Sequence, residues 1–223
     1  MALASAPTYL FEAGEKPSRP TLHVPVIEAT DQTLEGYGRL VDHPDDCEIE
    51  IVTWPAQGWR KVDAGTGNEG GVTEGTFTGM WQGDILYGTN SAVGGHYVLG
   101  WSQDPQAVSA LQASAPREQV LLWHFNYHPD GGQLFFPLEA KPFLVPVALP
   151  GDDLRPEQVV AFWCDGSKGL YIHPGIWHEG IFPVEDSQKF LDRQGRVHAR
   201  ISCDFGEEFG VYLAVPLSSE RPA

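Results

Sequence analysis

The sequence predicts an all-β protein, an antiparallel β-barrel or jelly roll with a few short helices. Its 223 residues include 25 glycines and 18 prolines but only 2 methionines, which favours short strands joined by turns over a helical bundle. Seven tryptophans and eleven phenylalanines suit a barrel with an apolar lining. Residues 1–223 have the length of one domain, and nothing in the chain repeats.

The first part of the chain predicts few regular elements. Residues 1–20 are expected to form a loose arm, and residues 21–30 a first strand. Residues 31–41 fit a short helix in which Asp31 or Thr33 is the cap. Residues 47–54 alternate between polar and apolar side chains, as a half-buried strand does.

Strands dominate the rest of the chain after a predicted loop. Residues 61–79 hold a GxGxxG pattern that no helix follows, which predicts a flexible loop. Residues 80–105 predict paired strands, and residues 105–114, opened by Asp104 and Pro105, predict an amphipathic helix. Eight further strands are predicted at 119–128, 133–138, 142–149, 158–164, 169–174, 177–184, 196–205 and 209–217.

Charge, cysteine content and hydropathy narrow the possible partners and setting. A formal net charge of −16 and a pI near 4.7 exclude a nucleic-acid or anionic-membrane partner, because either needs a basic patch. The widely spaced cysteines Cys47, Cys164 and Cys203 predict reduced thiols rather than disulfides. No signal peptide or apolar span of membrane length is present, so we expect a cytoplasmic protein.

Two short stretches hold half of the eight histidines, and each is predicted to lie in a β-hairpin. They are His124–Gln133 and His173–His178. Side chains two apart on a strand share a face, so Asn126 and His128 are expected to project together, with Gln133 returning on the facing strand.

These residues carry a resemblance to two nested groups of proteins. Asn126, His128 and Gln133 stand roughly where a cupin barrel places its first metal or substrate motif, and His178 resembles the histidine of the second motif. The runs HPDGGQLFFPL at 128–138, PFLVPVALPGDD at 142–153 and GLYIHPGIWHEGIF at 169–182 are together similar to the ureidoglycolate lyase family.

The resemblance implies a cupin-type barrel, usually dimeric, that splits ureidoglycolate into glyoxylate and urea during allantoin degradation in purine catabolism. The family positions that carry over are His128, Gln133, His173, Trp177 and His178. Asn126 stands where the family usually has a glutamate.

The reaction explains which residues we expect to be catalytic. Eliminating urea requires a base for the hydroxyl proton, a donor for the departing nitrogen and a group that holds the carboxylate. Histidine titrates near neutrality, so His128 and His178 are the catalytic candidates, with Gln133 orienting the substrate. A divalent metal ion on Asn126, His128, Gln133 and His178 is an alternative, although this neutral set lacks a carboxylate for a hard cation.

Five further residues are candidates for substrate binding, and four have a structural alternative. Asn126 shares the face of His128, whereas His124 lies deeper and is equally a core histidine. His173 fits a turn before Pro174, and Trp177 fits the barrel wall. Arg200 is either a carboxylate clamp or an exposed arginine opposite buried Cys203.

A second class of function is weighed beside the lyase. A diverged metallocupin that binds or isomerises a sugar acid is favoured by Asn126 in place of glutamate. The lyase is favoured by the retention of both histidines and Gln133. Either protein has a small-molecule partner, and we expect a homodimer.

Overall fold

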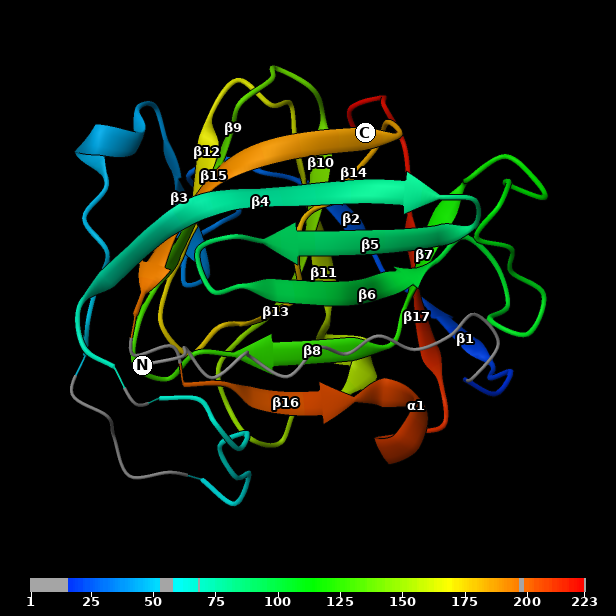
Figure 1. The fold of residues 1–223 in the computed structure, drawn as a ribbon, viewed down its shortest axis with the longest axis horizontal. Coiled ribbons are helices and arrows are strands. Elements are labelled where there is room, and N and C mark those ends of the chain that lie inside the picture. Colours follow the sequence, from blue (N-terminus) through cyan, green and yellow to red (C-terminus); the bar gives the residue numbers. More distant parts are fainter. Residues whose placement is uncertain (1–15, 53–57, 68, 197–198, 223) are drawn as a thin grey trace.

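Two β-sheets pack against each other in the computed structural model (Figure 1), which describes residues 16–52, 58–67, 69–196 and 199–222. The larger sheet is antiparallel except at its β1–β17 edge. In spatial order it contains β1 (Thr21–His23), β17 (Tyr212–Pro216), β7 (Gln119–Leu122), β6 (Gly95–Trp101), β5 (Ile85–Asn90), β4 (Val72–Gln82), β15 (Ser187–Gly195), β9 (Gln133–Pro137), β12 (Gly169–Ile172) and β3 (Gly38–Val41).

The smaller sheet has a similar, mostly antiparallel arrangement, with β2 parallel to β11. Its strands in spatial order are β16 (Ile201–Asp204), β8 (His124–Tyr127), β13 (Trp177–His178), β10 (Phe143–Ala148), β11 (Val160–Cys164) and β2 (Val26–Glu28), and β14 (Phe182–Pro183) pairs with β10. The helices are short, namely α1 (Phe205–Glu208) and two 3-10 turns, η1 (Pro44–Asp46) and η2 (Pro156–Gln158). The predicted all-β class with a few short helices is confirmed, and the described strands form two open sheets.

The chain crosses from one sheet to the other at both histidine stretches. β8 lies in the smaller sheet and β9 in the larger one, and β12 and β13 are divided in the same way. The two predicted hairpins are therefore wrong. Gly132 permits the first crossing, because a Cβ there would lie 2.0 Å from the Tyr171 hydroxyl. Crossing places Gln133 opposite Asn126 and His178 across the interior instead of beside them.

The N-terminal part differs from its predictions in two places. Residues 31–37 form turns followed by β3, because the Thr33 hydroxyl donates to the Glu28 carbonyl at 2.6 Å and competes with a regular helix. Residues 47–52 form no strand, and their pairing is limited to a bridge between Ile51 and Gly131. The predicted loose arm falls mainly on residues outside the described part of the chain, but Pro17 accepts a hydrogen bond from the Tyr212 hydroxyl at 2.7 Å.

Two further predictions are wrong in the region of β4 and β15. The predicted loop over 61–79 gives way to β4 at Val72. The predicted helix over 105–114 is a series of turns, because buried Asp84 accepts from the backbone amides of Ser109 and Ser114, both at 3.0 Å. β15 has no predicted counterpart, since its inward side chains include Gln188, Asp192 and Gln194.

Aromatic side chains pack in the space between the two sheets. Phe143 of the smaller sheet meets Phe190 of β15 edge to face, with ring centroids 5.0 Å apart. Phe77 and Phe135 of the larger sheet make a similar contact at 5.4 Å. Each buried phenylalanine stabilises the fold by about 1.5–3 kcal/mol. This packing sets the spacing between the two sheets.

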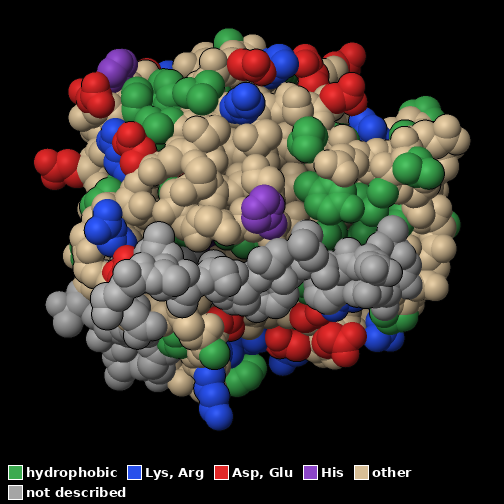
Figure 2. All heavy atoms as spheres, in the orientation of Figure 1, with side chains coloured by type: hydrophobic (Ala, Val, Ile, Leu, Met, Phe, Trp, Pro, Cys, Tyr) green, Lys and Arg blue, Asp and Glu red, His purple; other side chains and the backbone are tan. Residues whose placement is uncertain are grey.

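The structure shows where the charged side chains and the three cysteines lie. Figure 2 shows that charged side chains of both signs lie mostly around the margin of the face formed by β4, β5 and β6. Cys47, Cys164 and Cys203 are free and buried, which confirms the prediction of reduced thiols. Within the described residues, no helix has the length and apolar character needed to cross a membrane.

Asp84→Asn should destabilise the fold in a pH-dependent manner. Burial acts to raise the pKa of Asp84, but hydrogen bonds from Ser114, Ser109 and Ser102 outweigh it and lower the pKa to about 2. The ionised carboxylate therefore stabilises the fold above pH 4, and this contribution is lost as the pH falls towards 2. Urea unfolding at pH 7 should show a loss of about 2 kcal/mol.

The control for this substitution is Asp186→Asn, which alters an exposed carboxylate. The stability difference between wild type and Asp84→Asn should shrink below pH 4. A difference that stays constant between pH 7 and pH 3 would contradict the role given to Asp84.

Candidate active site

A pocket lies between the two sheets, and its empty space, counted together with the solvent at its mouth, is about 390 Å³. The larger sheet and the smaller sheet, with their adjoining loops, both contribute side chains to its wall. The lining residues are Phe77, Asn90, Tyr97, Asn126, His128, Gln133, Phe135, His178, Glu179, Gly180, Gln194 and Arg200. Asn126, His128, Gln133, His178 and Arg200 were predicted as site residues, so the structure brings five of the predicted side chains to one cavity.

The two pocket histidines are oriented by backbone carbonyls. His128 Nδ1 lies 3.0 Å from the Ala199 oxygen, and His178 Nδ1 lies 2.8 Å from the Ile176 oxygen. A carbonyl oxygen only accepts, so Nδ1 carries the hydrogen in both rings. The rings meet edge to face with centroids 5.2 Å apart. Burial lowers the pKa of His178 despite the hydrogen bond to Ile176, which favours the neutral ring with its lone pair on Nε2.

Gln133 connects His178 to a buried carboxylate. Its side-chain amide donates to Asp192 Oδ1 at 2.6 Å, and its Oε1 lies 3.1 Å from His178 Nε2. Asn90 and Gln194 donate to the other oxygen of Asp192, at 3.0 and 2.7 Å. Burial raises the pKa of Asp192 to about 6, and the three amide hydrogen bonds oppose that rise. The three amides thus stabilise the ionised carboxylate by donating hydrogen bonds, without a positively charged partner.

The contact between Gln133 and His178 constrains what can occupy the site. With Asp192 ionised and His178 neutral, Gln133 Oε1 and His178 Nε2 are both acceptors and repel each other at 3.1 Å. A proton or a metal cation between them removes that repulsion. The alternative is a protonated Asp192 with the Gln133 amide reversed, so that its NH₂ group faces His178.

The hydrogen bonds of the predicted metal set leave donor atoms available on its side chains. His128 and His178 both donate Nδ1–H to a carbonyl, which is how metal-binding histidines are usually held. Asn126 Nδ2 donates to the His178 carbonyl at 3.3 Å, which leaves its Oδ1 as an oxygen donor. The four residues would therefore offer a divalent cation two imidazole nitrogens and two amide oxygens. Among the described residues, no three His, Cys, Asp or Glu side chains gather in a way that would hold a metal ion by themselves.

His124 lies beside the pocket and pairs with a carboxylate. Its Nδ1 is 2.7 Å from Glu179 Oε2, and the Gly180 amide donates to Glu179 Oε1 at 2.9 Å. Glu179 itself lines the pocket and is buried. Gly180 must lack a side chain, because a Cβ there would lie 2.6 Å from Phe77 Cζ. The pocket thus has a carboxylate from Glu179, although Asn126 provides none.

Arg200 lies inside the pocket wall. It is 4% exposed, so the alternative of an exposed arginine is wrong. Its Nε donates to Asp63 Oδ2 at 2.8 Å. Among the described lining residues Arg200 carries the one permanent positive charge, in a position suited to an anionic group.

Three predicted residues, His124, His173 and Trp177, lie outside the lining of this pocket. His173 is partly exposed, with Nδ1 3.1 Å from Glu50 Oε1 and its ring at the edge of Tyr171. Trp177 is fully buried, packs against Tyr127 at 4.6 Å between ring centroids and donates to the Gly151 carbonyl at 2.7 Å. Its contacts match the wall position named as the alternative.

Several pocket residues were absent from the sequence-based prediction. Asn90, Tyr97 and Gln194 come from strands distant in sequence, and Asp192 lies directly behind Gln133. Burial raises the pKa of Tyr97 to about 12, so its phenol stays protonated. A local signal existed only for Glu179, which directly follows His178.

The fold and the pocket define a cupin-type all-β protein with two inward histidines and a glutamine between its sheets. Comparison with known proteins gives a narrower assignment. The sequence profile of the family described as "Ureidoglycolate lyase" matches residues 91–205, more than half of the chain.

Individual relatives agree with this match. The ureidoglycolate lyase of Azotobacter vinelandii is 36% identical over 129 residues, which cover 49% of this chain and 76% of that protein. The ureidoglycolate lyase of Stutzerimonas stutzeri is 37% identical over 95 residues, 42% of this chain and 56% of that protein. The chain belongs to the ureidoglycolate lyase family. It spans three quarters of the first relative and little more than half of the second.

Asp192→Asn should remove one component of the pH dependence of stability. An aspartate whose pKa rises from 3.8 to about 6 on folding binds a proton between pH 4 and pH 6 that the unfolded chain releases. Wild-type stability should therefore fall as the pH rises through this window, by about 3 kcal/mol. Unfolding free energies of both proteins at pH 4, 5, 6 and 7 measure the difference.

The opposite trend from His178 should be common to both proteins. Its lowered pKa makes the unfolded chain the better proton binder below about pH 6.5, which destabilises the fold at acid pH. Asp42→Asn, in an exposed ion pair with Lys168, is the control. A difference between wild type and Asp192→Asn that is flat from pH 4 to pH 7 would contradict the assignment.

Proposed function

We propose that this protein is a ureidoglycolate lyase that releases urea from ureidoglycolate and leaves glyoxylate, a carbon–nitrogen cleavage of the amidine-lyase type. The observation that carries the proposal is the meeting of His128, His178 and Gln133 in one pocket, within the stretch that matches the family. The family match favours this lyase over a sugar-acid cupin.

The reaction requires two proton movements about one carbon atom. The substrate hydroxyl loses its proton as the carbon–oxygen double bond forms, and the carbon–nitrogen bond breaks as the urea nitrogen gains a proton. His178, which burial favours in its neutral form, takes the hydroxyl proton at Nε2. Gln133 Oε1 then accepts a hydrogen bond from that proton, and Asp192 behind it offsets the new positive charge.

The remaining tasks fall to residues on other sides of the pocket. His128 delivers the proton to the departing nitrogen, and Asn126 orients the ureido group by hydrogen bonds. Arg200 holds the substrate carboxylate, because a guanidinium matches a carboxylate in both charge and shape. Glu179, paired with His124, keeps His124 in one orientation beside the pocket.

A divalent metal ion is proposed as the alternative to this histidine chemistry, because an ion bound at Nε2 of His128 and His178 occupies the lone pairs that would otherwise move the protons. Asn126, His128, Gln133 and His178 would hold it through two nitrogen and two oxygen donors. When bound, such an ion polarises the substrate oxygen and lowers the cost of removing its proton. The donor set is neutral, so we expect modest affinity for a hard cation.

We also propose that the enzyme is a cytoplasmic homodimer that acts in allantoin degradation. The resemblance to a usually dimeric family supports the assembly. The assignment to allantoin degradation follows from the proposed small-molecule substrate, ureidoglycolate.

Replacing the pocket histidines should abolish turnover. His128→Ala and His178→Ala each remove a group that moves a proton, so glyoxylate release should fall by about 10²–10⁴-fold. His173→Ala is the matched control, because His173 lies outside the lining of the pocket, and its rate should stay close to wild type. Turnover that survives in both pocket variants would overturn the proposed mechanism.

Removing metal should separate the two alternatives, because the histidine chemistry needs no ion. Elemental analysis of the purified enzyme should show one divalent ion per chain, and Gln133→Leu should reduce that content. Chelation should then lower glyoxylate release, with recovery when the ion is returned. Full activity in a metal-free enzyme would overturn the metal part and leave the histidine chemistry standing.

A further inference from the structure

A segment outside the family match reaches the pocket arginine. Residues 58–67 precede the matched stretch, which begins at residue 91. From this segment Asp63 accepts hydrogen bonds on Oδ2 from Arg200 Nε at 2.8 Å and from the Ser202 hydroxyl at 2.6 Å. The Asp63 amide also donates to the Arg200 carbonyl at 2.7 Å, and the Arg200 amide donates to the Thr66 hydroxyl at 3.1 Å. Arg200 is thus held at its side chain and at both backbone groups.

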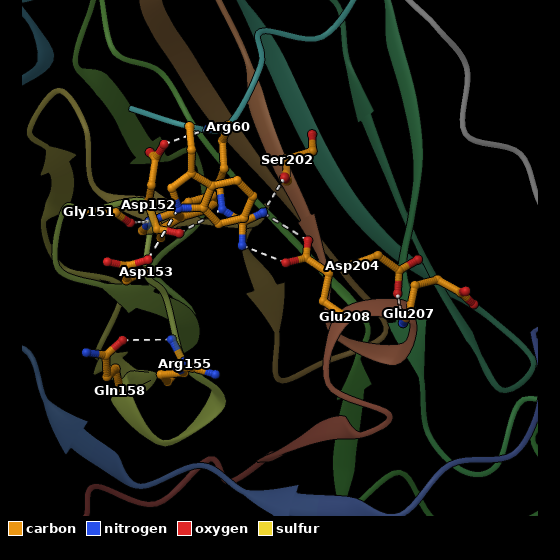
Figure 3. Close-up of polar contacts among 12 residues, drawn as sticks. Arg60, Gly151, Asp152, Asp153, Arg155, Gln158, Ser202, Asp204, Glu207 and Glu208 are labelled. Atoms are coloured by element: carbon orange, nitrogen blue, oxygen red, sulfur yellow. Dashed lines mark hydrogen bonds and ion pairs between the residues drawn. The ribbon is translucent and has the colours of Figure 1, made fainter. Parts of the chain in front are cut away.

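A second arginine fixes the segment itself to the fold. Figure 3 shows Arg60 between Asp152 and helix α1. Arg60 donates to both carboxylate oxygens of Glu208, at 2.9 and 2.6 Å, and to the backbone oxygens of Asp152 and Ser202, at 2.9 and 3.2 Å. It is 7% exposed and stacks over Trp59 at 4.4 Å. The position of Asp63 therefore rests on buried contacts that are independent of the pocket.

The charge on Asp63 has a physical role because Arg200 is buried. A buried guanidinium without a carboxylate partner is strongly unfavourable, so the pair with Asp63 keeps Arg200 at the pocket wall. The pair also offsets the positive charge of the pocket. Recognition of an anion then depends on where the guanidinium points more than on net charge.

We propose that Asp63 is a positioning residue that holds Arg200 for the carboxylate of a small monoanionic substrate. This inference rests on the proposed function for the identity of the substrate. Residues 58–67, which lie outside the family match, would then help the enzyme to distinguish a substrate with a carboxylate from a neutral one.

The test compares Asp63→Asn with Glu208→Gln. Asparagine keeps the shape of the side chain but removes the charge that pairs with Arg200. The KM for ureidoglycolate should rise about tenfold or more, since one charge-assisted contact is lost, while kcat changes less than about threefold. Glu208→Gln removes the carboxylate partner of buried Arg60 and should lower the free energy of unfolding. It leaves the pair of Asp63 and Arg200 intact, so the KM of the folded enzyme should stay within about threefold of wild type.

A neutral substrate separates positioning from general damage. The methyl ester of ureidoglycolate lacks the carboxylate, so Asp63→Asn should leave its KM unchanged. An equal rise for ester and acid, or no rise for the acid, would overturn the inference. Asp63→Glu retains the charge and should recover part of the affinity, and it serves as the second variant if Asp63→Asn unfolds.

A binding measurement separates this inference from the proposed function. Calorimetric titration with glyoxylate should show binding to wild type and to Glu208→Gln, and at least tenfold weaker binding to Asp63→Asn. A wild type that binds glyoxylate but does not cleave ureidoglycolate would overturn the proposed function alone. Equal glyoxylate affinity in wild type and Asp63→Asn, or no glyoxylate binding to wild type, would overturn the positioning role of Asp63.

Discussion

The contact between His178 Nε2 and Gln133 Oε1 is the point on which the pocket depends. His178 comes from the smaller sheet and Gln133 from the larger one, so the contact exists only while both sheets keep their spacing. Phe143 and Phe190 maintain that spacing by packing between the sheets. Core packing and pocket chemistry are therefore coupled, because a change in the distance between the sheets would alter a 3.1 Å contact between two polar atoms.

The carboxylates in and beside the pocket are each held by hydrogen-bond donors. Asp192 and Glu179 are buried and Asp63 is partly buried, and each of the three accepts hydrogen bonds from specific donors. Asp192 is held by three amides, which keeps its ionised form accessible without an adjacent arginine. Arg200 receives its partner from a separate segment. The pocket therefore presents few uncompensated charges to a ligand.

The sequence predicted the pocket where its signals were local and failed where they were long-range. Close spacing along the chain was enough to associate Asn126 with His128, and the turn after His128 led to Gln133. Asp192 was missed because the buried face of β15 is polar, so hydrophobic alternation is absent. The helix predicted over 105–114 failed because Asp84, far along the chain, binds its backbone amides. The passage of the chain from one sheet to the other could not be predicted, because hairpins and such crossings have the same turn residues.

The register of the long strand β15 determines which of its side chains face the pocket. Its nine residues pair with β4 on one side and β9 on the other, and alternate side chains face the interior. Deleting one residue ahead of Asp192 would shift the register and bring Arg193 to the inward position of Asp192. A cation would then stand behind Gln133 where an anion stands now. The loops that flank this strand can change in length without altering its register. A one-residue deletion ahead of Asp192 would instead reverse a charge at the centre of the protein.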